Sequence, residues 1–169
     1  MHENIPYSAS QIANFFLLKA KNDERPITML KLVKLCYIAH GWYLAVRNCG
    51  LIDENIEAWQ YGPVVPSVYH EFKHFERNPI DSLATEAIFD GMNFRFETPE
   101  IPKHDNVTRS ILEKVWDVYK NMRAGAFIDK THLENTPWSK HYEKGNPNKA
   151  IPDAEIKAHY KEILEKAVS

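Results

Sequence analysis

One apolar stretch constrains the fold of this chain more than any other. Over 35–46 the residues are apolar on nearly every side of a helix, and the run is interrupted only by His40 and Gly41. Such a helix must be surrounded by other elements, because none of its faces suits water. Thr28 is a natural N-cap before this run. The sequence therefore predicts a central buried helix over about 28–48.

Apolar residues at helical spacing predict further helices around the central one. We expect them at 10–21, at 66–77, from Thr108 onward, near 125–135 and at 153–167. In the helix at 66–77, Pro66 has a backbone angle that suits a first helical residue. In the last helix, Asp153 is the expected N-cap, since a carboxylate can accept from the free amides of a first turn.

Two short segments have patterns typical of β-strands. Residues 56–61 are aromatic and end at Gly62, which permits a tight turn, and at 92–96 apolar and polar residues alternate. We expect these segments to pair in a small antiparallel element near 56–61 and 92–96. The expected fold is mainly α, a helical bundle that forms a single domain over residues 1–169 around the central helix.

Composition limits the classes of partner. The chain has 169 residues and is 44% hydrophobic, which suits one domain with a substantial core. Its 21 Lys and Arg nearly balance its 23 Asp and Glu, so net charge favours neither nucleic acid nor an anionic membrane. A DNA-binding autorepressor is disfavoured because no basic recognition helix is present. No secretory signal or membrane span is seen, and the two cysteines lack paired spacing, so a cytoplasmic location is expected.

Residues 70–74 match a zinc-peptidase motif. They read His70-Glu71-Phe72-Lys73-His74, and in HExxH enzymes the two His bind zinc while the Glu activates water. Here Lys73 would place a cation beside the metal, and no third ligand follows at suitable spacing. A solvated helix face is favoured, and a zinc-dependent peptidase remains the alternative from another functional class.

Other chemistry has weaker support. Cys36 and His40 share a helix face, as a thiolate–imidazole pair would, but apolar surroundings raise the pKa of a thiol and disfavour its activation. Nucleotide-binding and nucleophile-elbow motifs are absent from the sequence. We therefore expect a protein without catalytic residues or cofactors.

The aromatic residues instead indicate a binding protein. Several cluster around the turn at Gly62-Pro63, and large aromatic side chains commonly anchor protein partners. Lysines mark the only clear polar stripe of the central helix. The residues expected to contact a partner are Lys31, Lys34, Tyr61, Tyr69 and Phe72. Trp42 and Trp59 are expected in the core, since they lie in the most apolar segments.

The order and spacing of particular residues carry a family resemblance. The first block runs from Thr28 to Tyr37 and continues through Trp42, Trp59, Gly62, Pro63, Pro66 and Tyr69. The second block includes His132, Pro137, Trp138 and Tyr160. Together they resemble the Panacea (SocA-like) antitoxin domain, which is often found in phage-associated proteins. The structural motif of this resemblance consists of Trp42, Trp59, Gly62, Pro63, Pro66 and Trp138.

The resemblance implies a mostly helical, cytoplasmic, non-enzymatic protein. Its expected function is to neutralise a cognate protein toxin, encoded beside it, by direct protein contact. A second role within the family is that of an adaptor that hands the toxin to a protease. Toxins paired with the family act on unrelated targets, so the resemblance does not name the partner. The sequence also allows the protein to form a homo-oligomer.

Overall fold

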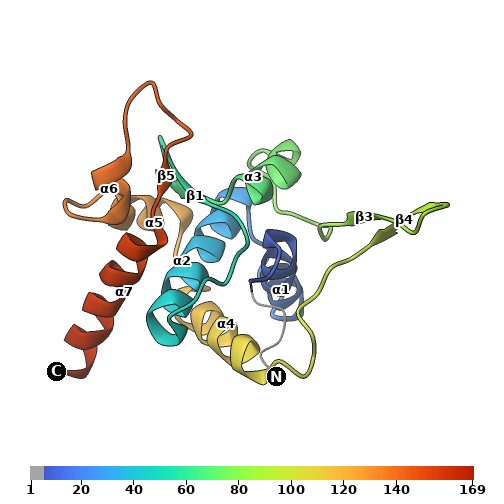
Figure 1. The fold of residues 1–169 in the computed structure, drawn as a ribbon, viewed down its shortest axis with the longest axis horizontal. Coiled ribbons are helices and arrows are strands. Elements are labelled where there is room, and N and C mark those ends of the chain that lie inside the picture. The colour runs from blue at the N-terminus through green and yellow to red at the C-terminus, as the bar shows by residue number, and fades with distance from the viewer. Residues whose placement is uncertain (1–5) are drawn as a thin grey trace.

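The computed structural model describes residues 6–169, which form a mainly helical fold with small antiparallel sheets, as expected (Figure 1). The helices are α1 (Ala9–Asn22), α2 (Met29–Arg47), α3 (Pro66–Phe72), α4 (Asn106–Tyr119), α5 (Ala124–Thr131), α6 (Pro137–His141) and α7 (Asp153–Val168), with a short 3-10 turn, η1 (Lys73–Phe75). The strands are β1 (Ile56–Trp59), β2 (Gly62–Val64), β3 (Glu86–Phe89), β4 (Phe94–Glu97) and β5 (Ala150–Ile151). Within this range, no helix has both the length and the apolar character needed to cross a membrane.

The predicted central helix is confirmed in α2. Thr28 is its N-cap and accepts a hydrogen bond from the amide of Lys31, while Asn48 ends it in the left-handed conformation with φ 58°. Helices α1, α4 and α7 all contact it, and nearly every residue from Leu32 to Ala45 is buried. The apolar surface on all sides of α2 is thus explained by neighbours on all sides.

Helix α7 packs closely on α2 because Gly41 has no side chain. The ring of Tyr160 occupies the place where a Cβ on residue 41 would stand. Trp42 also contacts this ring, edge to face, with 5.2 Å between the ring centroids. Trp42 is only partly buried, so its predicted place in the core is corrected to the edge of the core. The contact fixes how near the two helices can approach.

A polar contact also joins the two helices. The Nε2 atom of His40 lies 2.8 Å from Oδ1 of Asp153, and Nδ1 of His40 accepts from the Ile52 amide at 3.2 Å. The predicted N-cap role of Asp153 is wrong, since Pro152 holds that position. The carboxylate instead reaches back to α2 and fixes the start of α7 against it.

The strands form two separate sheets. The larger has the order β2-β1-β5, with Trp59 opposite Gly62 and Ile56 opposite Ile151. The segment at 92–96 contributes to β4, but β4 pairs with β3 and not with β1, so the expected pairing with 56–61 is wrong. A β3–β4 hairpin closes over a short loop, which costs less chain entropy than joining two distant segments.

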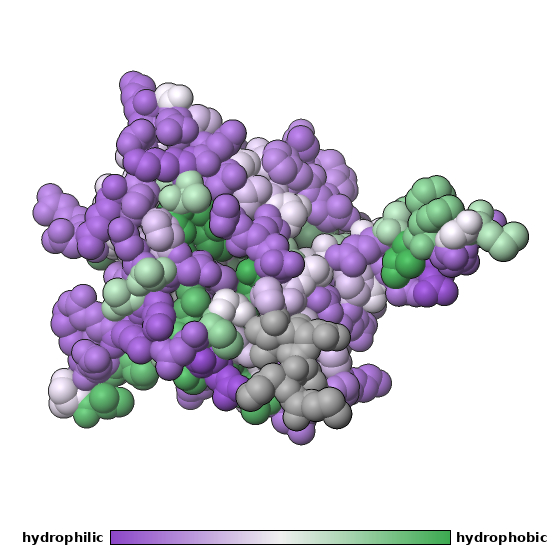
Figure 2. All heavy atoms as spheres, in the orientation of Figure 1, coloured by the Kyte–Doolittle hydropathy of each residue, from purple (hydrophilic) through white to green (hydrophobic). Residues whose placement is uncertain are grey.

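The β3–β4 hairpin, here called the arm (residues 86–97), projects from the body and is largely apolar (Figures 1 and 2). Phe94 and Phe96 are 72% and 75% exposed. The base of the arm is held by the buried side chain of Asn14, which donates to the carbonyls of Ala84 and Pro99 at 3.0 and 2.9 Å. One asparagine thus secures the chain both before and after the arm.

Several helix boundaries differ from the prediction because of local capping. The helix expected over 66–77 ends at Phe72 and continues as η1. The stretch near 125–135 yields only α5, and α6 starts separately at Pro137 with Thr136 as its N-cap. Helix α4 begins before Thr108, because Asp105 accepts from the Thr108 amide at 3.0 Å.

Replacing Gly41 with alanine tests the contact between α2 and α7. Because the added methyl group meets the Tyr160 ring, we expect overpacking to lower the free energy of unfolding by about 1–3 kcal/mol, measured by urea denaturation. Gly125→Ala is the matched control, since it is also helical and its Cβ would meet nothing within 4 Å. A Gly41→Ala protein as stable as the control would contradict the proposed close packing.

Candidate functional site

A pocket of about 710 Å³ lies between the first half of α2, the β1–β2 turn and the end of α3. Its apolar walls come from Met29, Leu30, Val33, Trp59, Tyr61 and Tyr69, and we call it the aromatic pocket. Three of the five residues predicted to contact a partner line it: Lys34, Tyr61 and Tyr69. Its volume lies within the range of pockets that bind ligands.

The aromatic wall of this pocket is built from β1 and α3. The rings of Trp59 and Tyr69 pack edge to face with 4.8 Å between their centroids, and the Trp59 indole donates to Glu57 at 2.7 Å. The Trp59 carbonyl accepts from the indole of Trp138 at 2.6 Å. These contacts leave Trp59 and Tyr69 partly buried, which corrects the expectation that Trp59 lies in the core. Tyr61, at the turn, is 61% exposed.

Lys34 is a pocket residue that the structure buries almost completely. It is 1% exposed, although the sequence placed it on a polar stripe of α2, and that expectation is wrong. The β1–β2 turn covers it, and the Lys34 ammonium donates to the Pro63 carbonyl at 2.9 Å. Gly62 permits this cover because its φ is 107° and because a Cβ there would lie 2.6 Å from Lys34 Nζ.

The buried ammonium has no counter-ion in the part of the chain described. Its one hydrogen bond within residues 6–169 is the bond to Pro63, and no carboxylate forms an ion pair with it. Burial lowers the pKa of Lys34 from 10.5 to about 7, because the charged form loses its hydration. Lys34 thus places a positive charge, or a neutral amine, beside a site whose walls are mostly apolar.

A second polar group lies in the same region. Burial lowers the pKa of His132, and the nearby charge of Lys34 lowers it further. The His132 ring stacks on Trp138 with 3.8 Å between centroids, while its Nε2 atom is buried without a hydrogen-bond partner in the described chain. Sequence reasoning missed this association, because nothing in the local pattern links His132 to α2.

The other two predicted contact residues lie outside the pocket. Lys31 is one turn before Lys34 on α2, and its ammonium donates to the Lys120 carbonyl at the end of α4. Phe72 is 2% exposed and belongs to the core. Pro66 starts α3 as expected, and this helix carries Tyr69 into the pocket wall.

The residues of the HExxH match do not assemble a metal site. Helix α3 ends at Phe72, so His70 lies in the helix while His74 lies in η1, and the two do not share one face of a continuous helix. Across residues 6–169, no three His, Cys, Asp or Glu side chains group closely enough to hold a metal ion. The zinc-peptidase alternative is therefore not favoured.

The Cys36–His40 pair is also unsuited to catalysis. Cys36 is fully buried, and burial raises the pKa of its thiol. Both ring nitrogens of His40 are engaged elsewhere, by Ile52 and by Asp153. The histidine therefore fixes the packing of α2.

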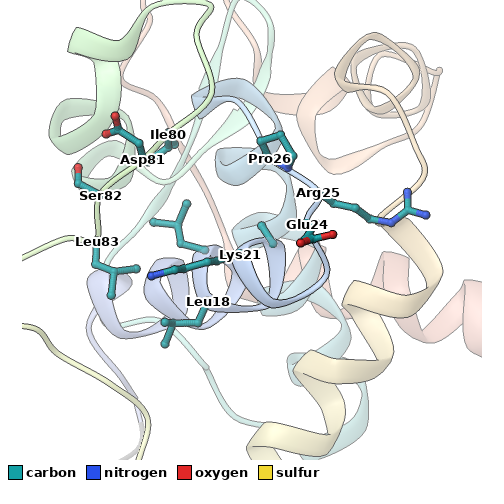
Figure 3. Close-up of a pocket in the computed structure, with 11 residues that line it drawn as sticks. Leu18, Lys21, Glu24, Arg25, Pro26, Ile80, Asp81, Ser82 and Leu83 are labelled. Carbon is teal, nitrogen blue, oxygen red and sulfur yellow. The ribbon is translucent and has the colours of Figure 1, made fainter.

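A second pocket, of about 530 Å³, lies between α1 and residues 80–83 (Figure 3). None of the predicted contact residues lines it, and its walls carry no aromatic side chain. Arg25 extends away from it, and its guanidinium donates to Asn121 at 2.5 Å. The aromatic pocket is the stronger candidate, since it combines exposed rings with a buried cation.

Replacing Lys34 with methionine tests the cost of burying this amine. Between pH 7 and 10.5 the unfolded chain binds a proton that the folded chain lacks, so wild-type stability rises with pH relative to the variant. We expect the Met variant to be more stable at pH 6.5, by about 3 kcal/mol, and this advantage to shrink by about pH 9.5. Urea denaturation at both pH values measures it.

Lys31→Met is the matched control for this experiment, because Lys31 lies one turn away and is only partly buried. The control should show a much smaller dependence on pH. If Lys34→Met is instead less stable than wild type at both pH values, Lys34 acts mainly as a structural tie to the Pro63 carbonyl.

Comparisons with known proteins agree with the resemblance seen in the sequence. The family model described as antitoxin SocA-like, Panacea domain, matches residues 32–139, which include most of α2, the aromatic pocket residues from β1 to α3, and the arm. Antitoxin SocA of Caulobacter vibrioides (strain NA1000 / CB15N) is 30% identical over 131 residues, which cover 77% of this chain and 68% of that protein. No solved structure matches the chain. On the family model and this relative, the chain belongs to the SocA-like antitoxin family with a Panacea domain.

Proposed function

We propose that this protein is a non-enzymatic antitoxin that neutralises a cognate protein toxin by direct contact through the aromatic pocket. Membership of the SocA-like family supports the antitoxin role. The observation that carries the contact site is the grouping of Tyr61, Tyr69 and Trp59 around one pocket. We place its action in the cytoplasm, where the unpaired thiols of Cys36 and Cys49 would stay reduced.

The pocket has the properties of an interface anchor site. Tyrosine and tryptophan give large contact areas with few rotatable bonds, and interface residues with the greatest energetic effect are enriched in them. The edge-to-face contact of Trp59 with Tyr69 holds both rings in place before a partner arrives. Exposed Tyr61 can then close on an inserted side chain. A pre-ordered wall of this kind reduces the entropy lost on binding.

The arm is a second candidate contact surface. Within residues 6–169 its two strands pair only with each other, so both outer edges keep unpaired backbone groups that a partner strand can join. Exposed Phe94 and Phe96 add apolar surface. A stable interface buries about 800 Å² on each partner, so a pocket and an additional surface together suit a toxin better than a pocket alone.

Co-expression with the toxin encoded beside this gene tests the proposal. We expect wild-type protein to restore growth, and Tyr61→Ala to weaken the toxin affinity of the purified protein by about 10- to 100-fold, measured by calorimetry. Tyr61 is exposed, so its loss should leave the thermal unfolding midpoint unchanged. Failure to rescue growth from any toxic neighbour would rule out the antitoxin role.

Two comparisons separate the alternatives. Phe94→Ala removes a ring of similar size from the arm, so loss of affinity in this variant alone would place the contact on the arm and not at the pocket. The amount of toxin in rescued cells tests the adaptor role. Undiminished toxin in an inhibited complex supports direct neutralisation, whereas its disappearance supports delivery to a protease.

A further inference from the structure

We infer that two copies of this chain form a dimer by packing the apolar faces of their arms against each other about a two-fold axis. The inference goes beyond the proposed function, because it assigns this face to a second copy and leaves the aromatic pocket and the outer edges of the arm to the toxin. It stands on the register of the two strands, the exposure of the rings and the position of the charges.

The register of β3 and β4 gives the arm an apolar face. Phe89 lies opposite Phe94, and Ala87 lies opposite Phe96. Directly opposed residues share a face of a sheet, as do alternate residues along one strand, so these four side chains lie together. The rings of Phe89 and Phe94 are accordingly in contact, with 4.9 Å between their centroids. One face of the ribbon therefore carries only apolar side chains.

The charged side chains of the strands lie on the opposite face. Glu86 lies opposite Glu97, and Ile88 lies opposite Arg95. Arg95 also forms an ion pair with Glu97 at 2.8 Å, and both side chains are exposed. Two arms that meet by their apolar faces keep these charged groups in water. The contact thus avoids the cost of burying an unpaired charge.

The apolar face is large enough for a stable interface. Phe89, Phe94 and Phe96 are 57%, 72% and 75% exposed, and Met92 at the tip of the arm is 87% exposed. If each large side chain has about 200 Å² of surface when fully exposed, these four present about 500–600 Å² in one copy. Two copies together bury about 1,000–1,200 Å², which reaches the size of specific protein interfaces.

A second copy suits this face better than an unrelated protein does. The face carries no polar side chain that would select an unrelated partner, whereas a second arm supplies a ribbon of the same length, twist and aromatic content. The arm also projects from the body, so two arms can stack while the helices stay apart (Figure 1). A two-stranded ribbon is only marginally stable alone in water, and a second copy covers its rings before any toxin binds.

Sedimentation equilibrium of the purified full-length chain tests the inference. We expect the wild-type protein to have twice the mass of one chain. Phe94→Glu places a carboxylate within the apolar face, so the dissociation constant of the dimer should rise by at least about 30-fold. Arg95→Gln is the matched control, because it also lowers the net charge by one but lies on the opposite face of the same strand. This control should keep the wild-type dimer affinity.

Three results would overturn the inference. The first is a wild-type chain that sediments as a monomer, and the second is a dimer that persists in Phe94→Glu. The third is loss of the dimer in Val118→Glu but not in Phe94→Glu. Val118 is 56% exposed on α4, so that result would place the interface on another apolar surface of the molecule.

Mixing two charge variants tests whether the arms face each other. Phe94→Glu and Phe94→Lys should each be monomeric at a concentration where the wild type is a dimer. Their equimolar mixture should associate at least about tenfold more tightly than either variant alone, because opposite charges then meet across the interface. A mixture that associates no more tightly would overturn the face-to-face packing.

Toxin binding separates this inference from the proposed function. If Phe94→Glu is monomeric and still binds the toxin, the face serves the dimer and the toxin binds elsewhere. If the wild type is monomeric and Phe94→Glu loses toxin affinity, the face belongs to the toxin, and the dimer inference falls while the antitoxin role stands. A dimer that neutralises no toxin would leave the inference in place and remove the antitoxin role.

Discussion

The close contact between Gly41 and the ring of Tyr160 determines much of the structure. Because residue 41 has no side chain, α7 lies directly against α2. Strand β5 immediately precedes α7 and pairs with β1, so the position of α7 also positions the sheet. The β1–β2 turn then covers Lys34. The candidate site therefore depends on a glycine that contributes no atom to it.

The same arrangement explains why the site is energetically unusual. Covering Lys34 removes its hydration, and the turn offers only one carbonyl, that of Pro63, as a hydrogen-bond acceptor. Natural proteins commonly keep such groups where binding needs them and recover the free energy elsewhere. Here the recovery comes from the buried apolar residues of α2 and their packing against the surrounding helices. A stable core thus supports a locally unfavourable pocket.

The sequence could predict those helices whose boundaries are set by capping side chains close to them in the chain. The capping side chains of Ser8 and Thr28 act within three residues, so the starts of α1 and α2 were predicted to within about one residue. Strand pairing was predicted wrongly, since a short alternating segment carries no information about its partner. The arm forms instead because Asp90 accepts from the amides of Met92 and Asn93, at 2.9 and 2.8 Å, and closes the hairpin locally.

For the candidate site, the sequence by itself determined the central helix, the family resemblance and the cluster of aromatic residues around Gly62. It could not place Lys34 inside the protein, because lysine on a helix is ordinarily solvated. Only the tertiary structure decided this, through a hydrogen bond between residues 29 positions apart. The spacing of apolar residues along the sequence indicates which face of a helix is apolar. Which distant segment covers a polar residue on that helix depends on the packing of the whole chain.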